Sequence, residues 1–71
     1  MAIDFILKTV RKELKVSQET LARKLNVSYA TINRWENNKA KPSRLAMEKL
    51  INYCTDNKIT SGILIELDKY R

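Results

Sequence analysis

The sequence predicts an all-α fold, a compact bundle of four to five short helices formed by one domain over residues 1–71. Two observations support this prediction. Apolar residues make up 44% of the chain and recur at helical spacing, whereas Gly and Pro, which interrupt helices, occur once each. A chain of 71 residues also buries only about 60% of the surface that it exposes when unfolded, so a deep catalytic pocket is not expected.

The first helix is expected over residues 3–14. One helical face of this segment is apolar, and its members are Ile3, Ile6, Leu7, Val10 and Leu14. Asp4 lies near the start of the segment, where the positive end of the helix dipole favours a carboxylate.

A second, short helix is expected over residues 18–25. Ser17 offers an N-cap oxygen in front of it, and its apolar stripe consists of Leu21, Ala22 and Leu25. Asn26 tolerates the left-handed conformation that ends a helix, and Ser28 offers the next N-cap only two residues later. The turn to the following helix is therefore very tight.

The third helix is expected from Tyr29 to about Asn37, and its two sides differ. At about 100° per residue, Ile32 and Trp35 mark the side that packs inward. The opposite arc carries Tyr29, Ala30, Asn33, Arg34 and Asn37. Arg and Asn can read guanine and adenine edges in the major groove of B-DNA, and small or aromatic groups contact thymine methyl groups there. Because single Asn and Arg residues are common on any helix surface, the flanking segments decide the interpretation.

The flanks of the third helix carry groups that suit a phosphate backbone. Gln18 and the backbone N–H groups at the start of the second helix can bind an anion, because helix N-termini attract negative charge. Three cations, Lys39, Lys41 and Arg44, are spread over the loop after the third helix and the start of the next one. They could follow the backbone of the same duplex.

A fourth helix opens at Pro42 and Ser43 and continues to about residue 55. Its buried side is formed by Ala46, Met47, Leu50, Ile51 and Cys54. The segment 57–71 forms a C-terminal helix or tail. Ile63, Leu67 and Tyr70 fit a helix begun near Ser61, which we favour, whereas Ile63, Ile65 and Leu67 also alternate as in a strand.

Charge and composition indicate the partner and the compartment. The chain has 14 cations and 8 acids, and the resulting charge of +6 favours an anionic partner such as nucleic acid or an acidic membrane surface. Its single cysteine, Cys54, cannot form an internal disulfide and is expected to be a small buried residue of a protein in a reducing compartment. No apolar run approaches the roughly 20 residues that span a bilayer, so no membrane partner and a cytoplasmic location are expected.

The residue inventory argues against an enzyme. The absence of histidine excludes His-based triads and Cys–His nucleophiles, and one cysteine and one glycine exclude the common zinc sites and glycine-rich phosphate loops. The acidic residues show no metal-loop spacing. We therefore expect no catalytic residue, metal, cofactor or small-molecule ligand.

Residues 17–44, SQETLARKLNVSYATINRWENNKAKPSR, resemble the lambda-repressor-like helix-turn-helix of the phage repressor and Cro type, the XRE family. The matching features are SQ at the cap of the second helix, LA in its middle, VS before the third helix, and RWEN followed by a basic KPS loop. With the first and fourth helices the resemblance covers residues 3–56, leaving 57–71 outside it.

The resemblance implies a set of site residues. The positions that face base edges are Tyr29, Ala30, Asn33 and Arg34, and those near the DNA backbone are Gln18, Ser28, Asn37, Lys39, Lys41 and Arg44. Arg11 and Glu36 match a structural salt bridge between the first helix and the end of the third. Asn26 and Asn38 stand where the family usually has Gly, at some backbone strain. Tyr29 departs from the family pattern, because it places a bulky ring at a base-reading position.

The leading hypothesis is sequence-specific binding of double-stranded DNA through the major groove by a transcription regulator such as a repressor, associated with the nucleoid when bound. Dimers are usual in this family, and the apolar tail over residues 59–67 is the expected place for a homodimer contact, unless it only closes the core. Two alternatives stay open. One is a DNA-binding module of a larger DNA-acting enzyme or of a restriction-modification controller, and the other is an antitoxin-type module that holds a protein partner.

Overall fold

The computed structural model describes residues 2–70, and within that range it contains five α-helices and no strand. They are α1 (Ile3–Leu14), α2 (Gln18–Leu25), α3 (Tyr29–Glu36), α4 (Arg44–Asp56) and α5 (Ser61–Asp68). The predicted all-α class is confirmed. The bounds of the first two helices agree with the prediction, while α3 ends one residue early, with Asn37 as its C-cap.

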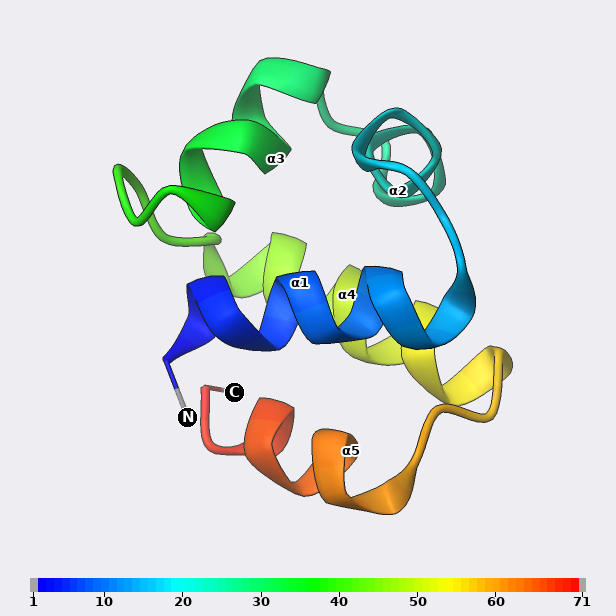
Figure 1. Cartoon of the computed structure of the whole chain (residues 1–71). Coiled ribbons are helices and arrows are strands. Elements are labelled where there is room, and N and C mark those ends of the chain that lie inside the picture. Colours follow the sequence, from blue (N-terminus) through cyan, green and yellow to red (C-terminus); the bar gives the residue numbers. More distant parts are fainter. Residues whose placement is uncertain (1, 71) are drawn as a thin grey trace.

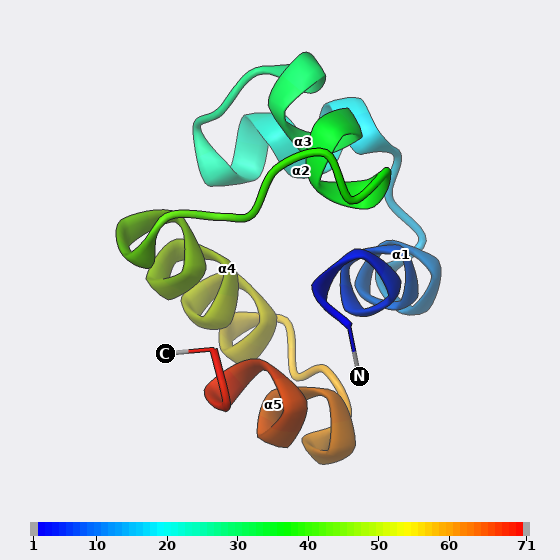
Figure 2. The ribbon, with the colours of Figure 1, turned by 90° about the vertical axis from the view of Figure 1, so that its left-hand side faces the viewer.

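The helices are arranged around α1. In Figure 1, α1 crosses the middle of the molecule, with α2 and α3 on one side of it and α5 on the other. Figure 2 shows that α4 lies across from α1, between the α2–α3 end and α5. α1 packs against α3 and α5, α2 packs against α3 and α4, and α4 packs against α5. α3 therefore lies at one end of the molecule and α5 at the other.

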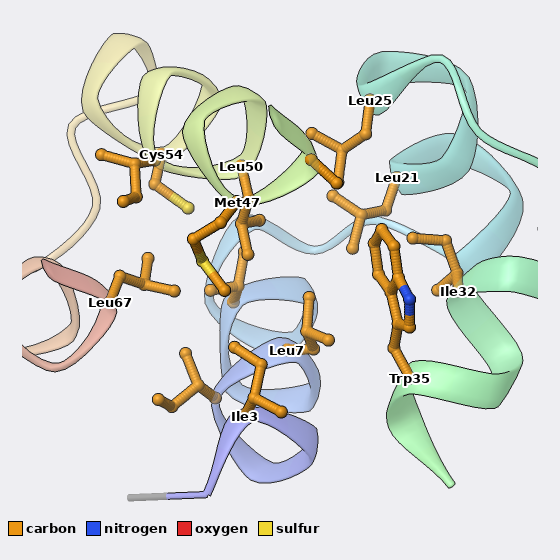
Figure 3. Packing of buried hydrophobic residues seen from close by; sticks show 14 of the residues in the cluster. Ile3, Leu7, Leu21, Leu25, Ile32, Trp35, Met47, Leu50, Cys54 and Leu67 are labelled. Carbon is orange, nitrogen blue, oxygen red and sulfur yellow. The ribbon is translucent and has the colours of Figure 1, made fainter. Parts of the chain in front are cut away.

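The core is formed by the apolar faces that the spacing predicts. Figure 3 shows Trp35 of α3 beside Ile32, with Leu21 of α2 and Leu7 of α1 facing its ring. The largest fully buried side chains are Ile6, Leu7, Val10, Leu21, Leu25, Ile32, Leu50, Cys54 and Leu67. Each such side chain contributes about 1.5–3 kcal/mol through burial. Leu14, expected on the same face, is only half-buried.

Three serines cap the helices around the tight turns. The Oγ atom of Ser17 accepts a hydrogen bond from the Thr20 N–H at 3.0 Å, and that of Ser28 accepts one from the Thr31 N–H at 3.1 Å. Ser43 caps α4 in the same way. An N-cap of this kind typically contributes about 1 kcal/mol. These bonds set where α2, α3 and α4 begin.

The connections after α1, α2, α3 and α4 each contain one residue in the left-handed conformation, and none is glycine. These residues are Lys15, Asn26, Asn38 and Lys58, with φ between 55° and 58°. The N–H of the residue after each of them donates to the carbonyl five positions earlier in the chain, as Val27 N–H does to the Ala22 carbonyl at 2.9 Å. Asn26 and Asn38 thus adopt the positive φ expected of the residues that replace glycine.

The C-terminal segment is helical, which confirms the favoured prediction and shows that the strand alternative is wrong. Ile63 and Leu67 are buried, whereas Ile65 is 62% exposed. Tyr70, predicted to share the buried face, lies beyond the end of α5 and is 38% exposed. Glu13 of α1 holds the start of α5, because its carboxylate accepts hydrogen bonds from the Thr60 N–H at 2.8 Å and the Thr60 hydroxyl at 3.1 Å.

Candidate nucleic-acid interface

The outer side of α3 carries the exposed residues Tyr29, Ala30 and Arg34. Ile32 and Trp35 are 0% and 4% exposed, so they fix the helix against the core. The outward positions are Tyr29, Ala30 and Arg34, all exposed, and Asn33, which is half-buried. The four residues expected to face base edges therefore share one side of one short helix, with a ring, a methyl, an amide and a guanidinium group on it.

The residues expected to contact the DNA backbone lie in the segments before and after α3 and at its two ends. Ser28, which caps α3, is exposed, and so are Asn37, Lys39, Lys41 and Arg44. Gln18 stands in the first turn of α2 and is only half-buried. Ser17, Gln18 and Glu19 at the N-terminus of α2 and Tyr29 at the start of α3 line one shallow hollow. Helix N-termini and cations together suit the oxygen atoms of phosphate.

A salt bridge ties α3 to α1. The Arg11 Nε atom donates to Glu36 Oε2 at 2.5 Å, and Nη2 donates to Glu36 Oε1 at 2.8 Å. The Glu36 side chain is 2% exposed and that of Arg11 is 25% exposed. The hydrogen bond with Glu36 raises the pKa of Arg11 above its ordinary value, so the guanidinium group stays charged. The two side chains implied by the resemblance are thus in direct contact.

Three amide side chains extend this contact across the interface. The Gln18 Nε2 atom donates to Glu36 Oε1 at 3.1 Å, and Asn33 Nδ2 makes a longer contact of 3.4 Å with Gln18 Oε1. Asn37 Nδ2 then donates to Asn33 Oδ1 at 3.1 Å. A continuous series of hydrogen bonds therefore runs from the buried carboxylate to the outer side of α3.

The sequence predicts that Gln18 contacts phosphate and that Asn33 contacts a base, and it indicates no bond between the two side chains. The spacing of Asn33 and Asn37 by four residues places them on one face of a helix and predicts their contact. The bonds from Gln18 to Glu36 and Asn33 depend on how α2 crosses α3. No spacing within the chain indicates them.

A shallow polar hollow adjoins this network. It has a volume of about 470 Å³ and is lined by Arg11, Ser17, Gln18, Glu19 and Tyr29. The hollow opens beside the N-terminus of α2, so the exposed edge of Arg11 and the amide of Gln18 border the same space. A group such as a phosphate could enter it.

The net charge is concentrated in the part of the chain that builds this region. Residues 1–46 contain ten cations and four acids, whereas residues 47–71 contain four of each. The entire excess of six positive charges therefore belongs to α1, α2, α3, their connecting loops and the first turn of α4, which begins with Arg44. This distribution favours a polyanion at the α2–α3 end of the molecule.

Within residues 2–70 no group of three or more His, Cys, Asp or Glu side chains is placed to hold a metal ion. None of the five helices is long and apolar enough to cross a membrane. Cys54 is fully buried, and burial raises the pKa of its thiol to about 12. It is a core residue, as its position in the fourth helix predicts.

A family model described as helix-turn-helix matches residues 7–54, more than half of the chain. The matched range runs from α1 to the last turn of α4 and includes the Arg11–Glu36 pair, the tight turn at Asn26 and the whole of α3. No curated protein and no solved structure matches the chain.

Proposed function

Because the chain belongs to the XRE-type helix-turn-helix family, a family of DNA-binding regulators, we propose that it binds double-stranded DNA sequence-specifically and reads the major groove with α3. The family is typically not enzymatic. Binding to its site in nucleoid DNA would regulate transcription. Where the site overlaps a promoter, the effect would be repression.

One observation carries this proposal: the inner side of α3 is fixed in the core, while Tyr29, Ala30 and Arg34 on its outer side are exposed. Ile32 and Trp35 anchor it in the core, and the Arg11–Glu36 pair holds its last turn. A helix fits the major groove, which is about 12 Å wide, and presents its outward side chains to base edges. Arg34 would donate two hydrogen bonds to a guanine, and the Tyr29 ring and Ala30 methyl would contact thymine methyl groups.

The surrounding groups would grip the strands. Lys39, Lys41 and Arg44 are exposed beside α3, and each can neutralise one phosphate. Gln18 and Ser28 stand at the N-termini of α2 and α3, where backbone N–H groups attract an anion. Phosphate contacts set the register of the helix on the duplex but carry no base information.

We also propose that two copies associate through the C-terminal segment. Ile65 on α5 is 62% exposed and Leu64 is half-buried, and both line a hollow with Ile51 and Thr55 of α4. α5 lies at the opposite end from α3, so this contact would leave the reading side free (Figure 2). To read a pseudo-palindromic site, such a dimer must hold its two α3 helices about 34 Å apart, on successive turns of the duplex.

Selection of duplexes from a random pool tests the proposal. We expect enrichment of one sequence with two-fold symmetry, and binding whose log K falls linearly with log salt by about 0.9 per phosphate contact. A pool that remains random after selection at low salt would contradict sequence-specific binding. Enrichment of an asymmetric half-site would retain the reading role of α3 and reject the dimer.

A further inference from the structure

The carboxylate of Glu36 determines which atoms donate and which accept in the hydrogen bonds among Gln18, Asn33 and Asn37. A carboxylate only accepts hydrogen bonds, and the two oxygens of Glu36 accept from Arg11 Nε and Nη2. Gln18 can therefore bond to Glu36 only through Nε2, which leaves its Oε1 toward Asn33. Asn33 must then present Nδ2 to that oxygen and Oδ1 to Asn37.

This direction matters because an amide side chain is nearly symmetric in shape. The terminal torsion of Asn is broad and roughly two-fold, so a free Asn33 could turn over and exchange its donor with its acceptor. The bonds from Gln18 and Asn37 leave one orientation. In that orientation Nδ2 of Asn33 keeps one N–H and Oδ1 keeps one lone pair. The N–H can donate to N7 of adenine, and the oxygen can accept from its N6 amino group.

We propose that Gln18 is a positioning residue for base readout: bonded to buried Glu36, it presets the amide of Asn33 and thereby sets an adenine preference at one base pair. This inference rests on the DNA-reading role proposed above. It gives Gln18 and Glu36, neither of which lies on the outer side of α3, an influence on sequence preference. Gln18 is half-buried, and its Oε1 and Nε2 atoms both bond within the protein.

A phosphate contact alone is the competing role for Gln18. Its Nε2 atom has a second N–H available, so one residue could both touch a phosphate and orient Asn33. The two roles of Gln18 can be distinguished by the effect of its substitution on DNA binding. Loss of a phosphate contact weakens binding to all sequences alike, whereas loss of positioning removes the preference at one base pair.

The test is duplex selection with the full chain and four variants. Asn33→Ala identifies the base pair that Asn33 reads. We expect Gln18→Ala and Gln18→Met, which keeps the length of the side chain, to lose the adenine preference at that same pair, by about 5-fold to 150-fold. Lys39→Ala is the matched control, because it removes a proposed phosphate contact and should retain every preference.

A uniform loss of affinity in both Gln18 variants, with the adenine preference intact, would overturn the inference and leave the proposed function standing. Failure of the unmodified chain to select any sequence would instead overturn the proposed function, and this inference with it. Circular dichroism melting checks that each variant is folded. In the free protein, the side-chain amide ¹⁵N–¹H signals of Asn33 should shift in both Gln18 variants and stay unchanged in Lys39→Ala.

Discussion

Arg11 and Glu36 lie 25 positions apart in the chain and meet in a two-point ion pair that joins α1 to the last turn of α3. Because the Glu36 side chain is almost fully buried, its charge depends on this partner for compensation. The pair therefore links the stability of the fold to the position of α3, the helix proposed to read DNA.

Removal of the cation from this pair should destabilise the protein. We expect Arg11→Met to lower the free energy of unfolding by about 3 kcal/mol, the lower end for a broken buried pair, because Arg11 is one quarter exposed. Urea unfolding measures the change. The double variant Arg11→Met/Glu36→Leu leaves no uncompensated charge and should recover part of the loss. Equal losses in the single and double variants would show that the buried charge is not the cause.

Loss of the guanidinium group on the outer side of α3 should change preference and leave stability unaltered. We expect Arg34→Ala to weaken binding to the selected site by about 1–3 kcal/mol and to relax the preference at one base pair. Binding to a panel of single-base variants of the site measures this. Arg23→Ala, at an exposed position in the last turn of α2, is the control. An unchanged preference in Arg34→Ala would refute this side of α3 as the reading side.

Lys39 is expected to contribute charge without base information. Lys39→Ala should weaken binding to all duplexes alike and should reduce the slope of log K against log salt by about 0.9. Salt titration of a selected and a scrambled duplex measures both effects. Lys49→Ala, on α4, removes the same charge elsewhere and should leave the slope unaltered. A slope that responds equally to both variants would assign the effect to net charge.

The raised pKa of Cys54 predicts a pH dependence. The thiol has an ordinary pKa of 9.0 in the unfolded chain and about 12 in the folded protein, because burial disfavours the thiolate. The unfolded chain therefore loses this proton first, and the stabilising contribution is complete below pH 9.0 and is lost as pH rises toward 12. The difference in free energy of unfolding between the unmodified chain and Cys54→Ala should shrink over this range. A difference independent of pH would contradict it.

The left-handed residue after α4 offers a stabilising substitution away from the candidate interface. Lys58 has a φ of 55°, a conformation that glycine adopts without strain from a Cβ atom. We expect Lys58→Gly to raise Tm by about 4–8 °C, the shift that about 1 kcal/mol gives in a domain of this size. Lys49→Gly, inside α4, should lower Tm by a similar amount. A lower Tm in Lys58→Gly would show that its side chain stabilises the turn.

The helices could be predicted because their limits are set locally. Ser17 and Ser28 cap the two helices that follow them, and apolar residues recur at helical spacing behind each cap. The sequence of the C-terminal segment is ambiguous, because the positions of Ile63 and Leu67 fit both the spacing of a helix and the alternation of a strand. Only the packing of α5 on α1 and α4, which exposes Ile65, distinguishes them.

The candidate site was predictable in its outward residues and not in its internal bonds. The direction of Tyr29, Ala30 and Arg34 follows from the angle between residues on a helix whose buried side is known. The bonding of Gln18 to Glu36 and Asn33 instead requires the crossing of two helices, to within a hydrogen-bond length. A single chain carries that information only through its complete fold.

Lys39 and Lys41 follow α3 at one end of the molecule, and Glu66 and Asp68 stand on α5 at the other (Figure 2), an arrangement that predicts an electric dipole along its length. A nearby polyanion would exert a torque on that dipole before any surfaces touch, turning the end with α2 and α3 toward it. A larger fraction of collisions would then begin in a productive orientation. Because dissolved ions shorten the reach of the field, this advantage would fade within about 10 Å at 0.1 M ionic strength.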